Sequence, residues 1–404
     1  MRVALVTTVD RGGVYVMTKK VALTLSKNHQ VVLFVIAPLL ANETISITKN
    51  FFEIRIRMWS PKIAARIPSS FVRWFFILLH MIRFFNYFLK FDILAADGIH
   101  GHGSFLSVIC RLSNTLTGKR RWCIILTYGL FNLEKLEWCR SSRIPRIRLW
   151  FYNFLELISI RYSDIILTAD KRTVGYICEK GGRSKVIYEP KCQAVDVAKF
   201  SFSSEVKKHY RKKLGIPESD IVLLFVGSFL FHNGPDIALE VYRKIAKEDK
   251  RVWLMYIGSW GDQKDIIKTE VLKEKLGKVI FLGWIPYDVI QNYMMIGDIG
   301  LLPRREPVCG IGNVTLEMMS LGIPIITTNV GTLSYVIVDG ENGFITSENN
   351  VEKMVKSAKF LIDNPVEREE MRRRAYEVVV ENFSFDAFSR KIDDIIRKLR
   401  RDDL

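Results

Sequence analysis

Short runs of apolar residues recur along the chain, and each is followed by a stretch with the spacing of an amphipathic helix. Runs such as Val3–Thr7 and Ile221–Val226 are apolar at successive positions, so strands formed from them must be buried on both faces. Strands of this kind that alternate with helices form doubly wound parallel sheets. We therefore predict an α/β fold whose further strands are Val31–Ile36, Ile93–Ala96, Cys123–Thr127, Ile165–Leu167, Lys185–Tyr188, Trp253–Ile257, Val279–Leu282, Ile299–Leu302 and Ile325–Thr327.

The chain has 404 residues, which is too long for one ordinary hydrophobic core, and its hydrophobic content of 49% is enough to fill two. A polar, basic stretch follows the strand-like segment that ends at Tyr188, which puts a domain boundary near Glu189–Ser204. We predict a first domain over residues 1–195, a second domain over residues 205–384, and a last helix near Phe385–Leu399 within residues 385–404.

The charge of the chain is strongly one-sided. The net charge is +17, and nearly all of this excess lies in residues 1–190. A basic domain implies an anionic partner, which can be a nucleic acid, a phosphorylated ligand or an acidic membrane surface. The sequence lacks zinc-finger spacing, a helix-turn-helix pattern and the aromatic motifs of RNA-binding domains, so we expect no nucleic-acid partner.

The segment 71–90 is rich in Phe, Trp, Leu and Ile, and its polar residues fall on one arc of a helix. Arg73 and Arg83 argue against a transmembrane helix, because a charge at the bilayer centre is costly. Two interpretations stay open: a helix that lies in the membrane interface, or an ordinary helix that covers the sheet. A basic run that precedes Trp150 favours an anionic membrane surface, and it consists of Arg140, Arg143, Arg146 and Arg148.

The six cysteines are scattered without CxxC pairs, which indicates neither a zinc site nor a disulfide framework. This usage is typical of a reducing compartment. The first apolar run is soon interrupted by Asp10 and Arg11, so it does not have the pattern of a signal peptide. We expect a cytoplasmic protein that is peripheral on the cytoplasmic face of the membrane.

A glycine-rich turn after the strand that ends at Leu302 carries the clearest functional signal. Gly310, Ile311 and Gly312 lead into a helix that we expect to open near Asn313 and Val314. Glycines let a ligand approach the backbone, and the unpaired N–H groups at a helix N-terminus bind phosphate. Glu317 lies about one turn inside this helix, where its carboxylate can accept both hydroxyls of a ribose.

The segment Gly310–Pro324 resembles the signature of glycosyltransferase family 4, and flanking motifs match in order: Gly283-Trp284-Ile285-Pro286 before it, and Gly331 and Asp339–Phe344 after it. The resemblance implies the GT-B fold, in which two Rossmann-like domains face a central cleft and a C-terminal helix returns to the first domain. It also implies retention of anomeric configuration and no essential metal or other cofactor.

The resemblance further assigns residues to a nucleotide-sugar donor. The diphosphate would lie against Ile311–Val314, with Glu317 on the ribose. Gly283 and Trp284 would flank the base. Gly12 and Gly13 match a glycine loop of the family that faces the donor phosphates from the first domain.

Several family positions carry other residues here. The family pattern has two acidic residues; the second is Glu317, and Cys309 stands at the position of the first. Tyr335 stands where the family has a glutamate. The histidine that the family has near Thr127 is missing. In the stretch that begins at Gly227, the phosphate-binding Arg and Lys positions are Ser228 and Asn233.

The candidates to compensate for these replacements come from neighbouring segments. Arg304 and Arg305 are the candidates to replace the missing cations, and Glu306 is a candidate carboxylate near the site. His232 is a weaker candidate. His100 and His102 follow a strand end of the first domain and are candidates for acceptor binding.

These observations lead to a hexosyltransferase-type glycosyltransferase that uses a nucleotide-sugar donor and a membrane-associated acceptor, either a lipid-linked glycan or a phospholipid. Loss of the Arg/Lys pair leaves a second interpretation open, a non-catalytic subunit that binds nucleotide sugar or glycan and assists an active transferase. A nucleotide-sugar epimerase or a sugar phosphorylase is a third.

Overall fold

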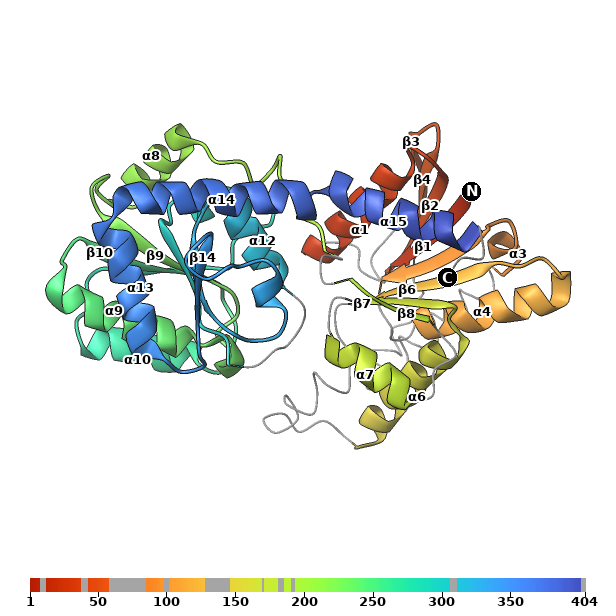
Figure 1. The fold of residues 1–404 in the computed structure, drawn as a ribbon, viewed down its shortest axis with the longest axis horizontal. Coiled ribbons are helices and arrows are strands. Elements are labelled where there is room, and N and C mark those ends of the chain that lie inside the picture. Colours follow the sequence, from red (N-terminus) through yellow and green to blue (C-terminus); the bar gives the residue numbers. More distant parts are fainter. Residues whose placement is uncertain are drawn as a thin grey trace. The chain divides into compact units, whose positions relative to one another are not determined.

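The computed structural model describes residues 1–7, 12–37, 43–57, 85–97, 102–127, 146–168, 171–180, 185–189, 193–305 and 311–400. The chain divides into two compact units (Figure 1). Unit 1 comprises Met1–Cys192 together with the chain from Phe388 on, and unit 2 comprises Gln193–Ala387.

Unit 1 is built on an eight-stranded sheet with the strand order β3-β4-β2-β1-β5-β6-β7-β8. Neighbouring strands are parallel except for the antiparallel pair β3 and β4. Parallel pairing follows from the sequence, because strands apolar at successive positions need helices on both faces. The strands are β1 (Arg2–Thr7), β2 (Gln30–Ala37), β3 (Glu43–Thr48), β4 (Phe51–Arg57), β5 (Ile93–Asp97), β6 (Trp122–Thr127), β7 (Ile165–Thr168) and β8 (Lys185–Tyr188).

The helices of unit 1 include α15, which comes from the other end of the chain. The described helices are α1 (Gly12–Leu25), α3 (Phe85–Phe88), α4 (His102–Thr117), α6 (Arg146–Tyr162), α7 (Lys171–Glu179) and α15 (Phe385–Arg400). Isoleucines of α15, Ile392 and Ile396 among them, line a small apolar cavity together with Val3 and Leu5 of β1. The helix therefore covers one apolar face of this sheet.

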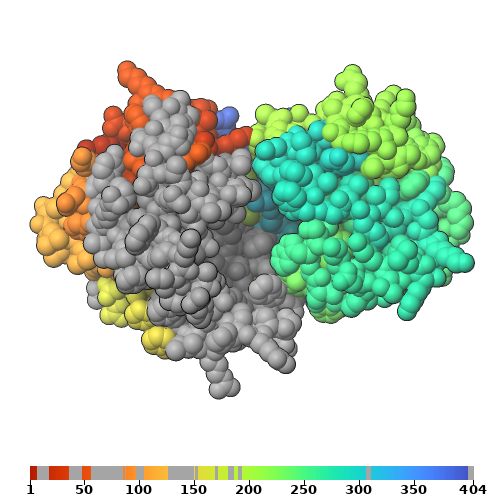
Figure 2. Space-filling model, turned by 180° about the vertical axis from the view of Figure 1, so that it is seen from behind, coloured from red at the N-terminus to blue at the C-terminus, as the bar shows by residue number. Residues whose placement is uncertain are grey.

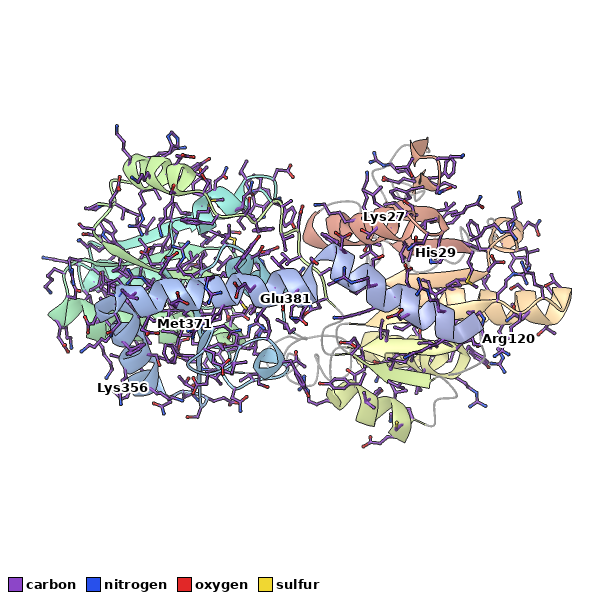
Figure 3. The ribbon with its side chains drawn as sticks, turned by 45° about the horizontal axis from the view of Figure 1, so that its top comes forward. Lys27, His29, Arg120, Lys356, Met371 and Glu381 are labelled. Atoms are coloured by element: carbon purple, nitrogen blue, oxygen red, sulfur yellow. The ribbon has the colours of Figure 1, made fainter. Side chains whose placement is uncertain are left out.

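Polar contacts fix α15 in place. Asn28 Nδ2 donates to Asp393 Oδ2 at 2.6 Å, and His29 Nε2 lies 3.0 Å from Asp393 Oδ1. Figure 3 shows His29 next to α15. Apolar burial and these hydrogen bonds together hold the helix against the sheet of unit 1.

Unit 2 is built on a six-stranded parallel sheet with the order β11-β10-β9-β12-β13-β14. Its strands are β9 (Ile221–Val226), β10 (Val252–Ile257), β11 (Val279–Gly283), β12 (Ile299–Leu302), β13 (Ile325–Thr328) and β14 (Gly343–Thr346). Its helices are α8 (Ser204–Lys213), α9 (Pro235–Glu248), α10 (Lys264–Lys273), α11 (Ile290–Met294), α12 (Asn313–Ser320), α13 (Val351–Asp363) and α14 (Pro365–Phe383).

Both faces of the unit 2 sheet are buried, as the side chains of β9 illustrate. Val222 and Leu224 pack into one apolar cluster with residues of α11, α12 and α14, whereas Leu223 and Phe225 pack into a second cluster with residues of α9, α10 and α13. The surface view of unit 2 shows α8 and the segments between α9 and β12, coloured yellow-green to cyan (Figure 2). The sheet is thus the middle layer of three.

The strands predicted from apolar runs all form, and β3, β4 and β14 are additional. β3 and β4 form the antiparallel edge of the sheet of unit 1. They alternate apolar and polar residues, so continuous apolar runs do not predict them.

Most of the segment 71–90, as well as Arg140 and Arg143, lies outside the described residues. At the described end of that segment Phe88 is buried in the core of unit 1. None of the described helices combines the length and the hydropathy that a membrane crossing requires.

Candidate donor site

The strand order of unit 2 places the candidate site. The chain starts at β9, moves outward through β10 and β11, and then crosses back to β12 on the other side of β9. In a doubly wound sheet the carboxyl ends of two such strands open a crevice at this switch point, where ligands bind. The segments that follow β9 and β12 are 227–234 and 303–305, and α12 comes after the second.

Gly312 shapes the entrance to α12. Its φ of +83° lies in the region that favours glycine, and it precedes the first helical residue, Asn313. A Cβ atom added to Gly312 would lie 2.6 Å from Nη2 of Arg304. Arg304 Nη1 donates to the carbonyl oxygen of Ile311 at 3.2 Å. A guanidinium group therefore lies against the turn that opens α12, where the helix dipole already favours an anion.

The neighbouring cation, Arg305, is engaged elsewhere. Its Nη1 and Nη2 atoms donate to the two carboxylate oxygens of Asp236 at 2.8 and 2.6 Å. The guanidinium carbon also lies 4.1 Å from the centre of the Phe231 ring. Arg305 thus ties the end of β12 to the first turn of α9, and its charge is balanced by Asp236. Of the two arginines, Arg304 is the one that lies against the turn that opens α12.

Ser228 and Asn233, where the family places cations, contact each other. Asn233 Nδ2 donates to Ser228 Oγ at 2.8 Å and to the Ser228 carbonyl oxygen at 3.2 Å. The pair is neutral and closes the loop after β9.

Close backbone packing marks the ends of β9, β10 and β11. Gly258 N donates to the Gly283 carbonyl oxygen at 2.9 Å, and Gly227 N donates to the Ile257 carbonyl oxygen at 2.9 Å. A Cβ atom on Gly258 would lie 1.9 Å from the carbonyl oxygen of Gly227, so only glycine fits there. Trp284, directly after Gly283, is 70% exposed.

Glu317 is the buried carboxylate of the site. It lies on α12 and is 7% exposed. Burial raises the pKa of Glu317 to about 7, and the positive charge of Lys199 opposes this rise. A carboxylate near half-ionisation in an apolar surrounding is a strong hydrogen-bond acceptor for ligand hydroxyl groups. Glu317 is a candidate from the sequence because it lies in the Gly310–Pro324 motif. Lys199 is not, because it lies in a basic stretch outside any motif.

In unit 1 the described candidate residues follow two paired strands. β1 and β5 are parallel neighbours. Gly12 opens α1 after β1, and His102 opens α4 after β5. Parallel strands end at the same edge of the sheet, so the first residues of α1 and of α4 lie at one edge. His100, Glu306, Cys309 and Gly310 lie outside the described residues.

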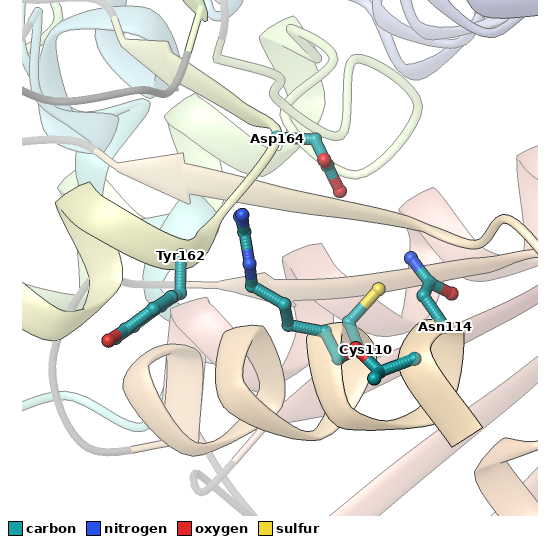
Figure 4. Close-up of a pocket in the computed structure, with 6 residues that line it drawn as sticks. Cys110, Asn114, Tyr162 and Asp164 are labelled. Atoms are coloured by element: carbon teal, nitrogen blue, oxygen red, sulfur yellow. The ribbon is translucent and has the colours of Figure 1, made fainter.

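Another cavity of about 360 Å³ lies at the opposite edge of that sheet. Figure 4 shows the lining side chains Cys110, Asn114, Tyr162 and Asp164. Two of these already serve the fold. Asn114 Nδ2 donates to the Arg121 carbonyl oxygen, and Asp164 Oδ2 accepts from Cys123 N. The cavity is therefore remote from the strand ends that carry the candidate residues.

Residues 206–378 match the family model for glycosyl transferases group 1. An uncharacterised glycosyltransferase of Methanocaldococcus jannaschii is 25% identical over 252 residues, which cover 60% of this chain and 62% of that relative. A D-inositol 3-phosphate glycosyltransferase of Corynebacterium diphtheriae is 27% identical over 192 residues, which cover 46% and 44%. The matches thus span less than two thirds of these relatives.

Solved structures match nearly the whole chain. A sucrose-phosphate synthase of Thermosynechococcus elongatus covers 99% of both chains with a TM-score of 0.73 and 16% identity. HepE of Anabaena, in complex with UDP, covers 98% of this chain and 100% of its own with a TM-score of 0.69 and 14% identity. These similarities show that the chain has the GT-B fold, with two Rossmann-like parallel-sheet domains.

Proposed function

We propose that this protein is a hexosyltransferase-type glycosyltransferase, of the family 4 type, that transfers a sugar from a nucleotide-sugar donor with retention of configuration. One observation carries the proposal. Buried Glu317 lies one turn inside α12, and the turn that opens this helix lies against the guanidinium group of Arg304 at the switch point of the sheet. This arrangement offers a carboxylate to a ribose and a positive helix end to a diphosphate.

In the transfer, the bond between the anomeric carbon and the diphosphate oxygen breaks, a bond to the oxygen of an acceptor hydroxyl forms, and the proton of that hydroxyl passes to the departing diphosphate. Negative charge then develops on the departing diphosphate. The N–H groups of the first turn of α12 and the guanidinium group of Arg304 stabilise that charge. Glu317 and Trp284 hold the nucleoside, so the reacting sugar is positioned by contacts remote from it.

The relatives support a nucleotide-sugar donor. HepE has been solved with UDP and with UDP-glucose, and a trehalose-6-phosphate enzyme of E. coli with UDP-2-fluoro glucose. We propose a uridine, guanosine or adenosine diphosphate sugar as the donor, with no essential metal. Chelation of divalent ions is then expected to leave transfer unchanged.

The described surface of α6 supports an acceptor at a membrane. Trp150 and Phe154 are 66% and 46% exposed and stack with their ring centres 5.8 Å apart. Leu157, also exposed, continues the same face of the helix. Exposed aromatic side chains in a basic domain suit the interface of an anionic membrane. We propose a lipid-linked glycan or a phospholipid as acceptor and a peripheral position on the cytoplasmic face.

Calorimetric titration of the purified protein with UDP-, GDP- and ADP-sugars tests the donor. We expect one base to bind selectively, and Glu317→Ala to weaken that binding by at least tenfold, since hydrogen bonds to a charged group contribute about 1.5–3 kcal/mol. Binding of no nucleotide sugar contradicts the proposal. Binding without transfer to any membrane extract, restored by a second protein, identifies the non-catalytic subunit instead.

A further inference from the structure

The segment that enters unit 2 is docked directly on the helix that carries Glu317. Phe200 is fully buried, and its carbonyl oxygen accepts a hydrogen bond of 3.0 Å from Oγ of Ser320. Ser320 lies three residues after Glu317 on α12, so the two side chains lie on neighbouring positions of one helix face. The Phe200 ring also meets the Tyr287 ring, with centres 6.0 Å apart. The segment therefore joins α12 to the loop that follows β11.

Lys199 makes the closest contacts at this junction. Its ammonium group donates to the carbonyl oxygen of Tyr287 and lies 3.5 Å from the centre of the Tyr287 ring. Its backbone N–H donates to Asp196 Oδ1 at 3.3 Å, which fixes the turn on which it sits. A cation over an aromatic face with a backbone carbonyl as acceptor is held in one geometry. Lys199 thus fastens the loop that begins with Trp284.

The titratable groups near Glu317 come from two segments besides α12. Lys199 comes from the segment that enters the unit, and Tyr287 and Asp288 come from the loop after β11. α12 itself carries no other titratable side chain. Burial lowers the pKa of Lys199, and the charges of Asp288 and Glu317 oppose that change. Lys199 is therefore a cation whose field opposes protonation of the buried carboxyl.

We propose that Lys199 is a positioning residue of the donor site: its ammonium group, held on the Tyr287 carbonyl oxygen and ring, fastens the Trp284–Asp288 loop beside the base and brings a positive charge to the helix that carries Glu317. The role in donor binding rests on the proposed function, whereas the action of Lys199 on Glu317 does not. Lys199 lies in the segment that enters unit 2, outside the motifs of the sequence.

The first experiment needs no ligand. The titration of the Glu317 carboxyl carbon is followed by NMR in the wild type, in Lys199→Met and in Lys199→Arg. A charge at close range shifts a carboxyl pKa by about 1–3 units, so Lys199→Met is expected to raise the pKa of Glu317 by at least about one unit, and Lys199→Arg to leave it near the wild-type value. Lys250→Met is the matched control, because Lys250 also donates to a backbone carbonyl but is exposed.

The second experiment measures donor affinity against pH. If the pKa of Glu317 moves from about 7 to about 8, its ionised fraction at pH 7 falls from about a half to about a tenth. Lys199→Met is then expected to weaken donor binding about fivefold more at pH 7 than at pH 9, where only the loss of the contact with Tyr287 remains. Lys250→Met is expected to bind as the wild type at both.

The outcomes separate the two proposals. If the Glu317 titration stays in place in Lys199→Met, or moves equally in Lys199→Met and Lys199→Arg, the inference about Lys199 is wrong whatever the protein binds. If no nucleotide sugar binds the wild type, the proposed function fails while the NMR titration still decides the electrostatic part. Should Lys199→Met lose its fold by circular dichroism, Lys199→Gln keeps a donor for the Tyr287 carbonyl without the charge and takes its place.

Discussion

The side-chain amide of Asn233 donates a hydrogen bond of 2.8 Å to the hydroxyl oxygen of Ser228. Two positions that carry an Arg and a Lys in the family resembled here are thus joined as a neutral pair. The loop after β9 is closed by this pair and carries no charge at these two positions. A guanidinium group still lies at the turn that opens α12, that of Arg304.

Restoring the two cations tests this conclusion. The double variant Ser228→Arg/Asn233→Lys is expected to bind the donor about tenfold or more tightly, because each charge-assisted contact contributes about 1.5–3 kcal/mol. Calorimetric titration measures the change, and Ser228→Gln/Asn233→Gln is the control for side-chain size. Equal affinity in both double variants would show that the phosphates do not reach this loop.

Arg304 and Arg305 are adjacent, but alanine substitutions at the two positions are expected to have different effects. Arg304→Ala is expected to lower turnover by at least about tenfold with little change in Tm, because it removes a contact to the diphosphate. Arg305→Ala leaves Asp236 without its bidentate partner and is expected to lower stability by about 1–3 kcal/mol. Transfer assays and thermal unfolding of both variants measure these effects. Exchanged phenotypes would assign the phosphate contact to Arg305.

Glu317 is expected to make stability depend on pH. Its pKa in the folded protein is about 7 against an ordinary 4.5, so its contribution is fully present below 4.5 and is lost as the pH rises through 7. The difference corresponds to about 3 kcal/mol. Glu317→Gln is therefore expected to gain about that much relative to the wild type between pH 4.5 and pH 8. Urea unfolding at both pH values measures it, and exposed Glu341→Gln is expected to show no such trend.

Substitution of Gly258 tests whether the close backbone packing at the ends of β9 and β10 is needed for stability. Gly258→Ala places a methyl group 1.9 Å from the Gly227 carbonyl oxygen, and the backbone has to shift. We expect a loss of more than about 2 kcal/mol in the free energy of unfolding and weaker donor binding. Gly277→Ala, where an added Cβ atom meets nothing within 4 Å, is the control. Similar stability of the two variants would show that the strand ends adjust easily.

The exposed face of α6 is expected to bind anionic membranes. The variant Trp150→Ala/Phe154→Ala is expected to sediment with anionic vesicles several-fold less than the wild type at low salt, and salt is expected to weaken binding of both. Leu272→Ala removes an equally exposed apolar side chain from unit 2 and is the control. A wild-type protein that stays in the supernatant would exclude this surface as a membrane contact.

The sequence was most informative where one local pattern decides the structure. Apolar runs such as Ile221–Val226 predict buried strands, and both Rossmann-like domains follow from their alternation with helices. β4 was missed because Phe51–Arg57 alternates apolar and polar residues at the edge of a sheet, where partners distant in sequence supply the pairing.

The residues of the candidate site also differ in how far the sequence predicts them. Glu317 is recognisable because it stands in a motif, at a fixed distance from a glycine turn. The roles of Arg305 and Lys199 depend on Asp236 and Tyr287, which are distant in sequence. Only the tertiary structure shows that one of these cations is balanced by a carboxylate and that the other lies near Glu317.

The course of α15 has a consequence for how the protein is made. The helix covers an apolar face that includes Val3 and Leu5, yet it is synthesised after the whole of unit 2. On the ribosome, the first sheet therefore emerges with part of one apolar face uncovered, and unit 2 can complete its core before unit 1 does. Nascent unit 1 is expected to need protection from aggregation, by a chaperone or by the membrane, until the last helix arrives.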